Sequence, residues 1–192
     1  MKNDSNWIIV RIDGKIAAIS TDYRHLASIT ARLAKDCKTR YGEITATTAC
    51  FDEVWQLKET TGWEDMMLFG TDFQKKVWKK LYELTRPENN GSLTPRLISY
   101  SDFAELCQNR AGVRAVAHAV GLNPISILIP CHLVVPKEAI DKMREIQKKA
   151  ESTIFRGSDL CMDSILRDTS IDFGEYALGR ELKREMIMRE LT

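Results

Sequence analysis

The segment of residues 127–135, with the sequence ILIPCHLVV, is the feature that most constrains this chain. Aliphatic and β-branched residues surround a corner formed by Pro130, Cys131 and His132. This pattern predicts a buried strand that presents a thiol and an imidazole at its end. A cysteine attacks as the thiolate, and an adjacent imidazole can take its proton. The alternative, which an isolated Cys-His dipeptide favours, is a buried structural cysteine beside an incidental histidine.

The composition is that of an ordinary globular protein of 192 residues, 44% apolar and 29% charged, which is one large domain or two small ones. The net charge is +1, so any contact with DNA must come from a local patch. No apolar run approaches the length of about 18 residues that a transmembrane helix needs, and the polar N-terminus does not resemble a signal peptide. We therefore expect a cytoplasmic (or nucleoid-associated) protein.

The five cysteines are scattered, odd in number and without CxxC spacing, which argues against a disulfide scaffold and fits a reducing compartment. They are Cys37, Cys50, Cys107, Cys131 and Cys161. His25 with Cys37 and Cys50 could be interpreted as part of a metal site, but a structural zinc needs four suitably spaced ligands. The sequence therefore predicts no metal.

The N-terminal third predicts a small α/β domain. Asp13-Gly14 separates two β-rich segments and predicts a hairpin, a helix is expected from about Tyr23, and residues 43–51 are expected to form a third strand. Residues 52–67 are expected to be a linker with some ordered structure, in which Trp55 and Trp63 are packing anchors. We place the domain boundary near residue 70.

Two helical patterns open the C-terminal part. Thr71 and Gln74 have the spacing of a capping box before an apolar stripe, so a helix is expected to begin here. After a Pro/Asn/Gly loop at residues 86–95, residues 99–107 and 112–120 predict two short helices joined by a four-residue turn, which fits a helix-turn-helix. The second helix is rich in alanine, which is compatible with close approach to a nucleic-acid groove or with tight packing in a core.

The last helix carries a carboxylate where apolar residues are expected. Leu182, Met186 and Glu190 share one face, and a carboxylate on an apolar face is costly unless it is paired. Glu190 therefore needs a buried partner, unless the end of the helix is frayed into water.

The segment of residues 136–172 is expected to contain an amphipathic helix, within residues 138–151. Its mixed charges favour a solvated cover packed on the domain, and the alternative is an enlarged DNA-binding wing. The cations of such a wing would be Lys142, Lys148, Lys149 and Arg156.

Several short motifs occur in a fixed order along the chain: Ser99-Tyr100, Arg114-Ala115-Val116, Asn123-Pro124, residues 127–132 and residues 173–179. This series resembles the O6-alkylguanine-DNA alkyltransferases. The resemblance implies an α/β N-terminal domain at residues 1–69, with a small ribonuclease-H-like sheet plus a helix. It implies a mainly α, winged-helix-like catalytic and DNA-binding domain at residues 70–192, which contains the helix-turn-helix. Residues 136–172 are longer than the family's usual connection and form an unusual insertion.

The resemblance also implies a reaction. Cys131 would receive an alkyl group, methyl above all, from O6 of guanine in DNA, in a single turnover without cofactor or metal. His132 would take the thiol proton and Glu190 would hold the imidazole, while the Tyr100 hydroxyl would donate a proton to the leaving base. Asn123 would hold the turn before the cysteine.

The implied partner is double-stranded DNA containing O6-alkylguanine, bound through its minor groove by a monomer. Arg114 would fill the stack vacated by the flipped nucleotide, with Tyr100, Ala115 and His118 also at the DNA. The resemblance also implies a substrate pocket, which would be lined by Ser126, Val134, Tyr176 and Ala177.

Three positions depart from the family pattern: Leu133 replaces an arginine, Ala177 a serine and Ser126 a proline. Two alternatives of other classes remain. One is a sensor that binds alkylguanine DNA without repairing it. The other is a cysteine hydrolase that uses Cys131, His132 and Glu190, although an oxyanion hole is not evident.

Overall fold

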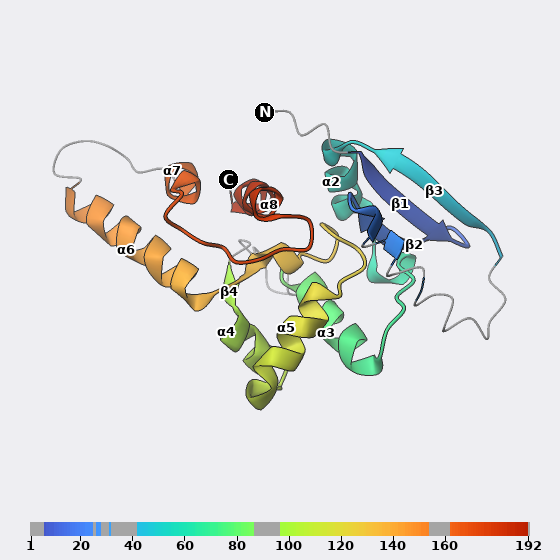
Figure 1. The fold of residues 1–192 in the computed structure, drawn as a ribbon, viewed down its shortest axis with the longest axis horizontal. Helices are drawn as coiled ribbons and strands as arrows, with labels where there is room; N and C mark the ends of the chain where they lie inside the picture. Colours follow the sequence, from blue (N-terminus) through green and yellow to red (C-terminus); the bar gives the residue numbers. More distant parts are fainter. Residues whose placement is uncertain are drawn as a thin grey trace. The chain divides into compact units, whose positions relative to one another are not determined.

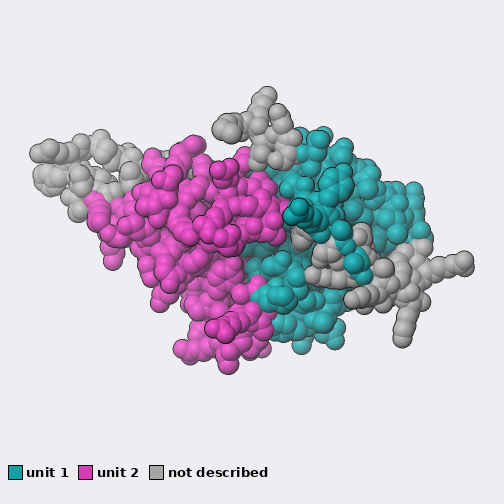
Figure 2. Space-filling view, viewed as in Figure 1, with its two compact units in different colours: residues 1–83, 118–131 teal, residues 84–117, 132–192 magenta. Residues whose placement is uncertain are grey.

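The computed structural model describes residues 6–24, 26–27, 31, 42–86, 97–153 and 162–191. The chain forms two compact units (Figure 2), which are described separately. Unit 1 comprises Met1–Glu83 and His118–Cys131, and unit 2 comprises Leu84–Ala117 and His132–Thr192. Because compactness does not test where a folding domain ends, the boundary expected near residue 70 stays a prediction.

Unit 1 contains a three-stranded antiparallel sheet of order β2-β1-β3 (Figure 1). Its strands are β1 (Trp7–Ile12), β2 (Lys15–Ser20) and β3 (Ile44–Ala49). Asp13 and Gly14 both have positive φ, 50° and 78°, as the tight turn of a two-residue hairpin requires. The predicted hairpin and third strand are confirmed.

The segment after the third strand, expected to be a linker with some ordered structure, is mostly helical. Residues 52–67 lie mostly in helix α2 (Phe51–Thr60), followed by the short 3₁₀ helix η1 (Trp63–Asp65). Glu53 Oε2 accepts a hydrogen bond of 2.7 Å from the N–H of Cys50, which starts α2 and lowers the pKa of Glu53. The predicted packing roles of the tryptophans are confirmed, since Trp55 and Trp63 each contact an aromatic ring at centroid distances of 5.5 and 5.4 Å.

Helix α3 (Asp72–Glu83) starts with the predicted capping box. Thr71 N–H donates to Gln74 Oε1 at 2.9 Å, and Gln74 N–H donates to Thr71 Oγ1 at 3.2 Å. Phe73, in the first turn of α3, is 37% exposed. Trp78 is fully buried and its indole N–H donates to the Ala119 carbonyl at 2.8 Å, which ties α3 to the segment that leads to Cys131.

The outer edge of β2 supports the turn that precedes Cys131. Ile19 forms a parallel bridge with Ile125, with Ile19 N–H donating to Pro124 O at 3.0 Å and Ser126 N–H donating to Ile19 O at 3.2 Å. The N-terminal sheet thus helps to position this turn. Its sequence does not indicate this role, because it contains no cluster of reactive residues.

Unit 2 contains β4 (Ile98–Ser99), α4 (Tyr100–Leu106), η2 (Arg110–Gly112), β5 (Val134–Val135), α6 (Lys137–Thr153), α7 (Met162–Arg167) and α8 (Arg180–Leu191). Two further elements cross the division of the units: α5 (Val113–Gly121) and the 3₁₀ helix η3 (Cys131–Leu133). The two short helices expected at 99–107 and 112–120 are confirmed as α4 and α5. β4 pairs in parallel with β5, so that Ile98 lies opposite Val134 and Ser99 opposite Val135.

The strand predicted at residues 127–135 is wrong, although the predicted burial is confirmed. Only β5 is extended; Ile127 has a φ of 72°, turns occupy the segment up to Ile129, and η3 carries Cys131. An apolar run reports burial without specifying the backbone conformation. Here local bonds bend the chain, with Leu128 N–H donating to Ser126 O at 2.9 Å and Cys131 N–H to Ile129 O at 2.8 Å.

The amphipathic helix expected in residues 136–172 is confirmed as α6. Its apolar residues Ile140, Met143 and Ile146 pack against a buried cluster of unit 2. This cluster consists of Val135, Ala139, Ile165, Leu166, Ile171, Phe173 and Ile187. α6 therefore covers a core with one face, as its mixed charges predict.

Some predictions fall outside the described residues. These include most of the helix expected from Tyr23 (with His25 and Cys37), most of the 86–95 loop, Arg156 and Cys161. Among the described residues, none of the helices is long and apolar enough to cross a membrane. Within those same residues, no group of three or more His, Cys, Asp or Glu side chains is arranged to hold a metal.

Candidate active site

The Cys131 thiol of unit 1 lies beside the side-chain amide of Asn123. Cys131 is 7% exposed, and Asn123 Nδ2 donates to its Sγ at 3.0 Å. The same amide donates to Ile129 O at 2.8 Å, while Asn123 Oδ1 accepts from Ile125 N–H at 3.1 Å. One buried amide therefore holds the turn and contacts the sulfur, and an N–H donor stabilises a thiolate more than a thiol.

His132 and Glu190 form a buried pair in unit 2. Nε2 of His132 lies 3.1 Å from Oε1 of Glu190, and their side chains are 0% and 5% exposed. The partner that the apolar face of the last helix requires is therefore present. Because Glu190 engages Nε2, proton exchange by the imidazole would use Nδ1. His132 follows Cys131 directly in the chain and in η3.

A second buried charge on α8 was missed by the sequence analysis. Lys183 is 1% exposed and its Nζ donates to the carbonyl of Val134 at 3.0 Å. The available signal was spacing, since Lys183 stands two helical turns before Glu190 on the face that also carries Met186. An ammonium group thus holds the backbone two residues after His132.

The loop before α8 is closed by ion pairs. Arg180 donates to Glu175, Nε to Oε1 at 3.0 Å, and approaches Asp172 at 3.5 Å. The hydrogen bond from Arg180 lowers the pKa of Glu175, and Glu175 in turn raises the pKa of Arg180. Within the loop, Tyr176 is half-buried and Ala177 is exposed.

Helix α5 has one exposed and one buried face. Arg114, Ala115 and His118 are exposed, whereas Val116 and Ala119 are buried. Its small residues therefore serve core packing on one side and leave the other side open. This arrangement accommodates both interpretations of the alanine-rich sequence.

The other expected site residues are distributed over the two units. Unit 1 holds Asn123, Ser126 and Cys131, and unit 2 holds Tyr100, His132, Val134, Tyr176, Ala177 and Glu190. Ser126 and Val134 are buried, and Tyr100 is half-buried at the first position of α4, directly after β4. The common substrate pocket expected from Ser126, Val134 and the loop residues stays a prediction.

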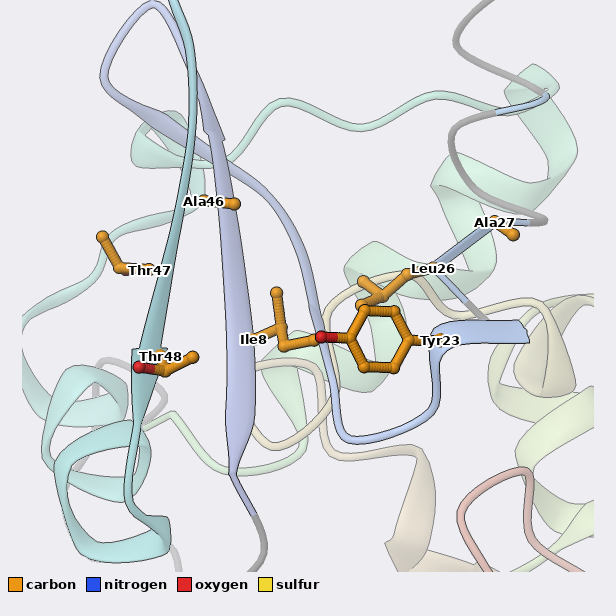
Figure 3. Close-up of a pocket in the computed structure, with 7 residues that line it drawn as sticks. All are labelled: Ile8, Tyr23, Leu26, Ala27, Ala46, Thr47 and Thr48. Atoms are coloured by element: carbon orange, nitrogen blue, oxygen red, sulfur yellow. The ribbon is translucent and has the colours of Figure 1, made fainter.

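A hollow in unit 1 is not lined by any of these residues (Figure 3). Its volume is about 390 Å³, and its lining is Ile8, Tyr23, Leu26, Ala27, Ala46, Thr47 and Thr48. Among the described residues that line it, the Tyr23 phenol is the only titratable group, and none of them offers a carboxylate, an imidazole or a thiol for catalysis.

The α/β fold and these contacts define a protein with a buried candidate thiol nucleophile, followed at once by a histidine–carboxylate pair. Residues 72–152, which include Cys131 and His132, match the family model described as "6-O-methylguanine DNA methyltransferase, DNA binding domain". The match covers less than half of the chain, and it agrees with the resemblance that the ordered motifs indicate.

Individual relatives agree with the family match. A probable methylated-DNA–protein-cysteine methyltransferase of Acanthamoeba polyphaga mimivirus is 47% identical over 73 residues, 38% of this chain and 44% of that protein. The methylated-DNA–protein-cysteine methyltransferase of Haemophilus influenzae is 42% identical over 69 residues, 36% of this chain and 34% of that protein. The aligned region thus spans less than half the length of either relative.

A solved structure extends the likeness in fold. The O6-methylguanine-DNA methyltransferase of Pyrococcus kodakaraensis superposes with a TM-score of 0.51 at 23% identity, covering 97% of this chain and 92% of that one. At this identity the likeness concerns the fold alone.

Proposed function

We propose that this chain repairs DNA as a methylated-DNA–protein-cysteine S-methyltransferase, moving an alkyl group from O6 of guanine to Cys131 once per molecule. The observation that carries the proposal is the buried hydrogen bond between His132 and Glu190. His132 directly follows Cys131, whose sulfur accepts a hydrogen bond from Asn123. The family match of residues 72–152 supports the same function.

The proposed reaction is a single displacement. The Cys131 thiol gives its proton to His132, directly or through a water, and Glu190 stabilises the resulting imidazolium. The thiolate sulfur forms a bond to the alkyl carbon while the bond from that carbon to guanine O6 breaks. The electron pair leaves with the base, and Tyr100 donates a proton to it. The product thioether is stable to hydrolysis, so each molecule acts once.

The substrate must leave the DNA stack before the thiol can reach it. Extrusion of a nucleotide costs a few kcal/mol, and a side chain that fills the gap offsets part of this cost. We assign this role to Arg114, which lies on the exposed face of α5 with Ala115 and His118. In this proposal α4 and α5 are a helix-turn-helix in a winged-helix-like domain, and α5 enters the minor groove.

Recognition of the base would use backbone groups as well as side chains. Val134 and Ala177 contribute polar main-chain atoms, and an N–H at position 177 survives the change from the family's serine. Ser126 has a smaller side chain than the proline of the family pattern, so the wall of the pocket at this position would be less bulky. The N-terminal sheet would be ribonuclease-H-like, and we propose that the protein acts as a monomer in the cytoplasm or nucleoid.

Mass spectrometry tests the proposal directly. The full chain is incubated with a duplex carrying O6-methylguanine, and the intact mass and cysteine-containing peptides are measured. We expect a gain of one methyl group on Cys131 and equimolar loss of O6-methylguanine. Cys50→Ser is the matched control because Cys50 is a free, exposed cysteine outside the site, and this variant should react as the wild type does.

The other outcomes select the alternatives. Lesion-specific binding without methyl transfer would favour the sensor, which shares the fold and the DNA face. Repeated turnover of an ester or amide that depends on Cys131 would favour the hydrolase. A methyl group on Cys50 or Cys107 instead of Cys131 would also contradict the proposal.

A further inference from the structure

Arg184 on α8 binds the end of the insertion. Its Nη1 donates to Leu166 O at 2.5 Å and to Asp168 O at 3.0 Å, and its Nη2 donates to Ile171 O at 2.5 Å. The guanidinium carbon also lies 4.8 Å from the centre of the Phe173 ring. Leu166 is among the last residues of α7. The final carbonyls of a helix have no N–H donor within their own helix. Arg184 therefore caps α7 from a different helix.

The neighbouring side chains of α8 extend this contact. Ile187 is fully buried in the cluster that contains Ile165 and Phe173, and Met188 and Leu191 pack against the same cluster. One side of α8 is thus held by the segment after α6, through hydrogen bonds to carbonyls as well as through apolar packing.

Two further contacts of α8 are made with the residues that follow Cys131. Lys183 donates to Val134 O at 3.0 Å, and Glu190 binds His132 at 3.1 Å. α8 is a continuous helix of 12 residues, so its axial position is common to all of these side chains. A displacement of α8 that follows from losing the Arg184 contacts would move Glu190 and Lys183 as well.

We propose that Arg184 is a positioning residue, which anchors α8 on the inserted segment and thereby aligns Glu190 with His132. The insertion is then part of the framework of the active centre rather than a cover alone. This inference rests on the proposed alkyl transfer, because the expected consequence of losing Arg184 is a slower transfer of the Cys131 proton to the imidazole of His132.

The charges of α6 favour this role over that of a DNA-binding wing. α6 carries five cations, and among the described contacts three of them are in ion pairs on the helix itself. Lys142 and Lys149 both bind Glu145, and Arg144 binds Asp141. Much of the positive charge is therefore balanced within the helix, whereas Arg184 makes three specific bonds to the last turn of α7 and the residues that follow it.

The test compares Arg184→Gln with Arg184→Lys and with Arg189→Gln, a matched control on an exposed position of the same helix. Single-turnover methyl transfer from O6-methylguanine duplex is measured across a range of pH. In parallel, NMR of ¹⁵N-histidine-labelled protein follows solvent exchange of the His132 ring N–H, assigned with a His132→Gln sample. Thermal unfolding and near-ultraviolet circular dichroism report how much of each variant is folded.

We expect Arg184→Gln to transfer about tenfold to a hundredfold more slowly, which is the usual effect of a small misalignment of reacting groups. Its pH profile should shift and its His132 ring N–H should exchange faster, while Arg184→Lys recovers part of both and Arg189→Gln matches the wild type. A folded Arg184→Gln with the wild-type rate, pH profile and exchange would overturn the inference. A loss of rate that only follows the unfolded fraction would do the same.

Two further outcomes are decisive. If Arg184→Gln does not fold, Arg184→Lys carries the test, and a wild-type pH profile and exchange rate for that variant would overturn the inference. If the wild-type protein itself transfers no methyl group, the proposed function fails. The exchange measurement still reports whether Arg184 holds the His132–Glu190 pair.

Discussion

Nδ2 of Asn123 lies 3.0 Å from Sγ of Cys131, eight residues further along the chain. The same amide is bonded at both of its polar atoms to the backbone of the intervening turn. The position of the thiol and the conformation of its turn therefore depend on one side chain. Since both residues belong to unit 1, the N-terminal sheet that supports this turn also supports the thiol.

Asn123→Asp replaces the N–H donor at the sulfur by a carboxylate oxygen. We expect the thiolate fraction of Cys131 at neutral pH to fall about tenfold or more, because a like charge disfavours the anion by a pKa unit or more. The pH dependence of iodoacetamide labelling, followed at the Cys131 peptide, measures this fraction. Asn109→Asp, directly before η2, is the matched change, and equal labelling of the two variants would contradict the expectation.

Glu190→Gln keeps the size of the side chain and removes its charge. The imidazolium formed when His132 takes the thiol proton then lacks a buried counter-charge, so transfer should slow by about a hundredfold or more. Rapid-quench transfer assays measure the rate, with Glu181→Gln, an exposed change on the same helix, as control. Unchanged rates in both variants would show that the carboxylate has no part in proton transfer.

Leu133→Arg restores the family's residue at a position that is completely buried here. A buried guanidinium without an acidic partner should lower the free energy of unfolding by about 3 kcal/mol or more. Urea denaturation measures this change, and Leu106→Arg, at a side chain that is 43% exposed, should be nearly neutral. A stable Leu133→Arg variant would indicate that the site can accommodate the charge.

Arg114→Ala tests the exposed face of α5. We expect weaker binding to duplex DNA at unchanged thermal stability, together with a smaller dependence of affinity on salt if the side chain contacts phosphate. Arg110→Ala is the control, because Arg110 is 87% exposed and is paired with Glu105 at 2.9 Å. Equal losses of affinity in the two variants would argue for a diffuse electrostatic effect rather than a role specific to Arg114.

The loop that carries Tyr176 and Ala177 should loosen in acid. The pKa of Glu175 is lowered in the fold by its bond with Arg180, so this contact stabilises the loop above the ordinary pKa of a glutamate. The contribution is lost as the pH falls through the lowered pKa. The effect is small because the pair is exposed. Hydrogen exchange of the loop amides against pH measures it, and Glu175→Gln should remove the pH dependence while retaining the loosened loop.

Much of the local structure was predictable from residue types at short spacing. Asp13-Gly14 marked its hairpin, Thr71 with Gln74 marked the start of α3, and the apolar repeat at Ile140, Met143 and Ile146 marked α6. The same reasoning missed α2, since Glu53 bonds to a cysteine N-cap that capping preferences do not indicate.

The sequence by itself determined which chemical groups the site contains and that they are buried: a thiol, an imidazole and a carboxylate on an apolar helix face. Only the tertiary structure decided their partners and their backbone. Residues 127–133 became turns and η3 instead of a strand, His132 met Glu190 across 58 residues, and Arg184 bound carbonyls at the end of α7 and just after it. The reason is physical, because turns and caps are hydrogen-bonded within a few residues, whereas partners far apart in the chain are selected by the packing of the whole unit.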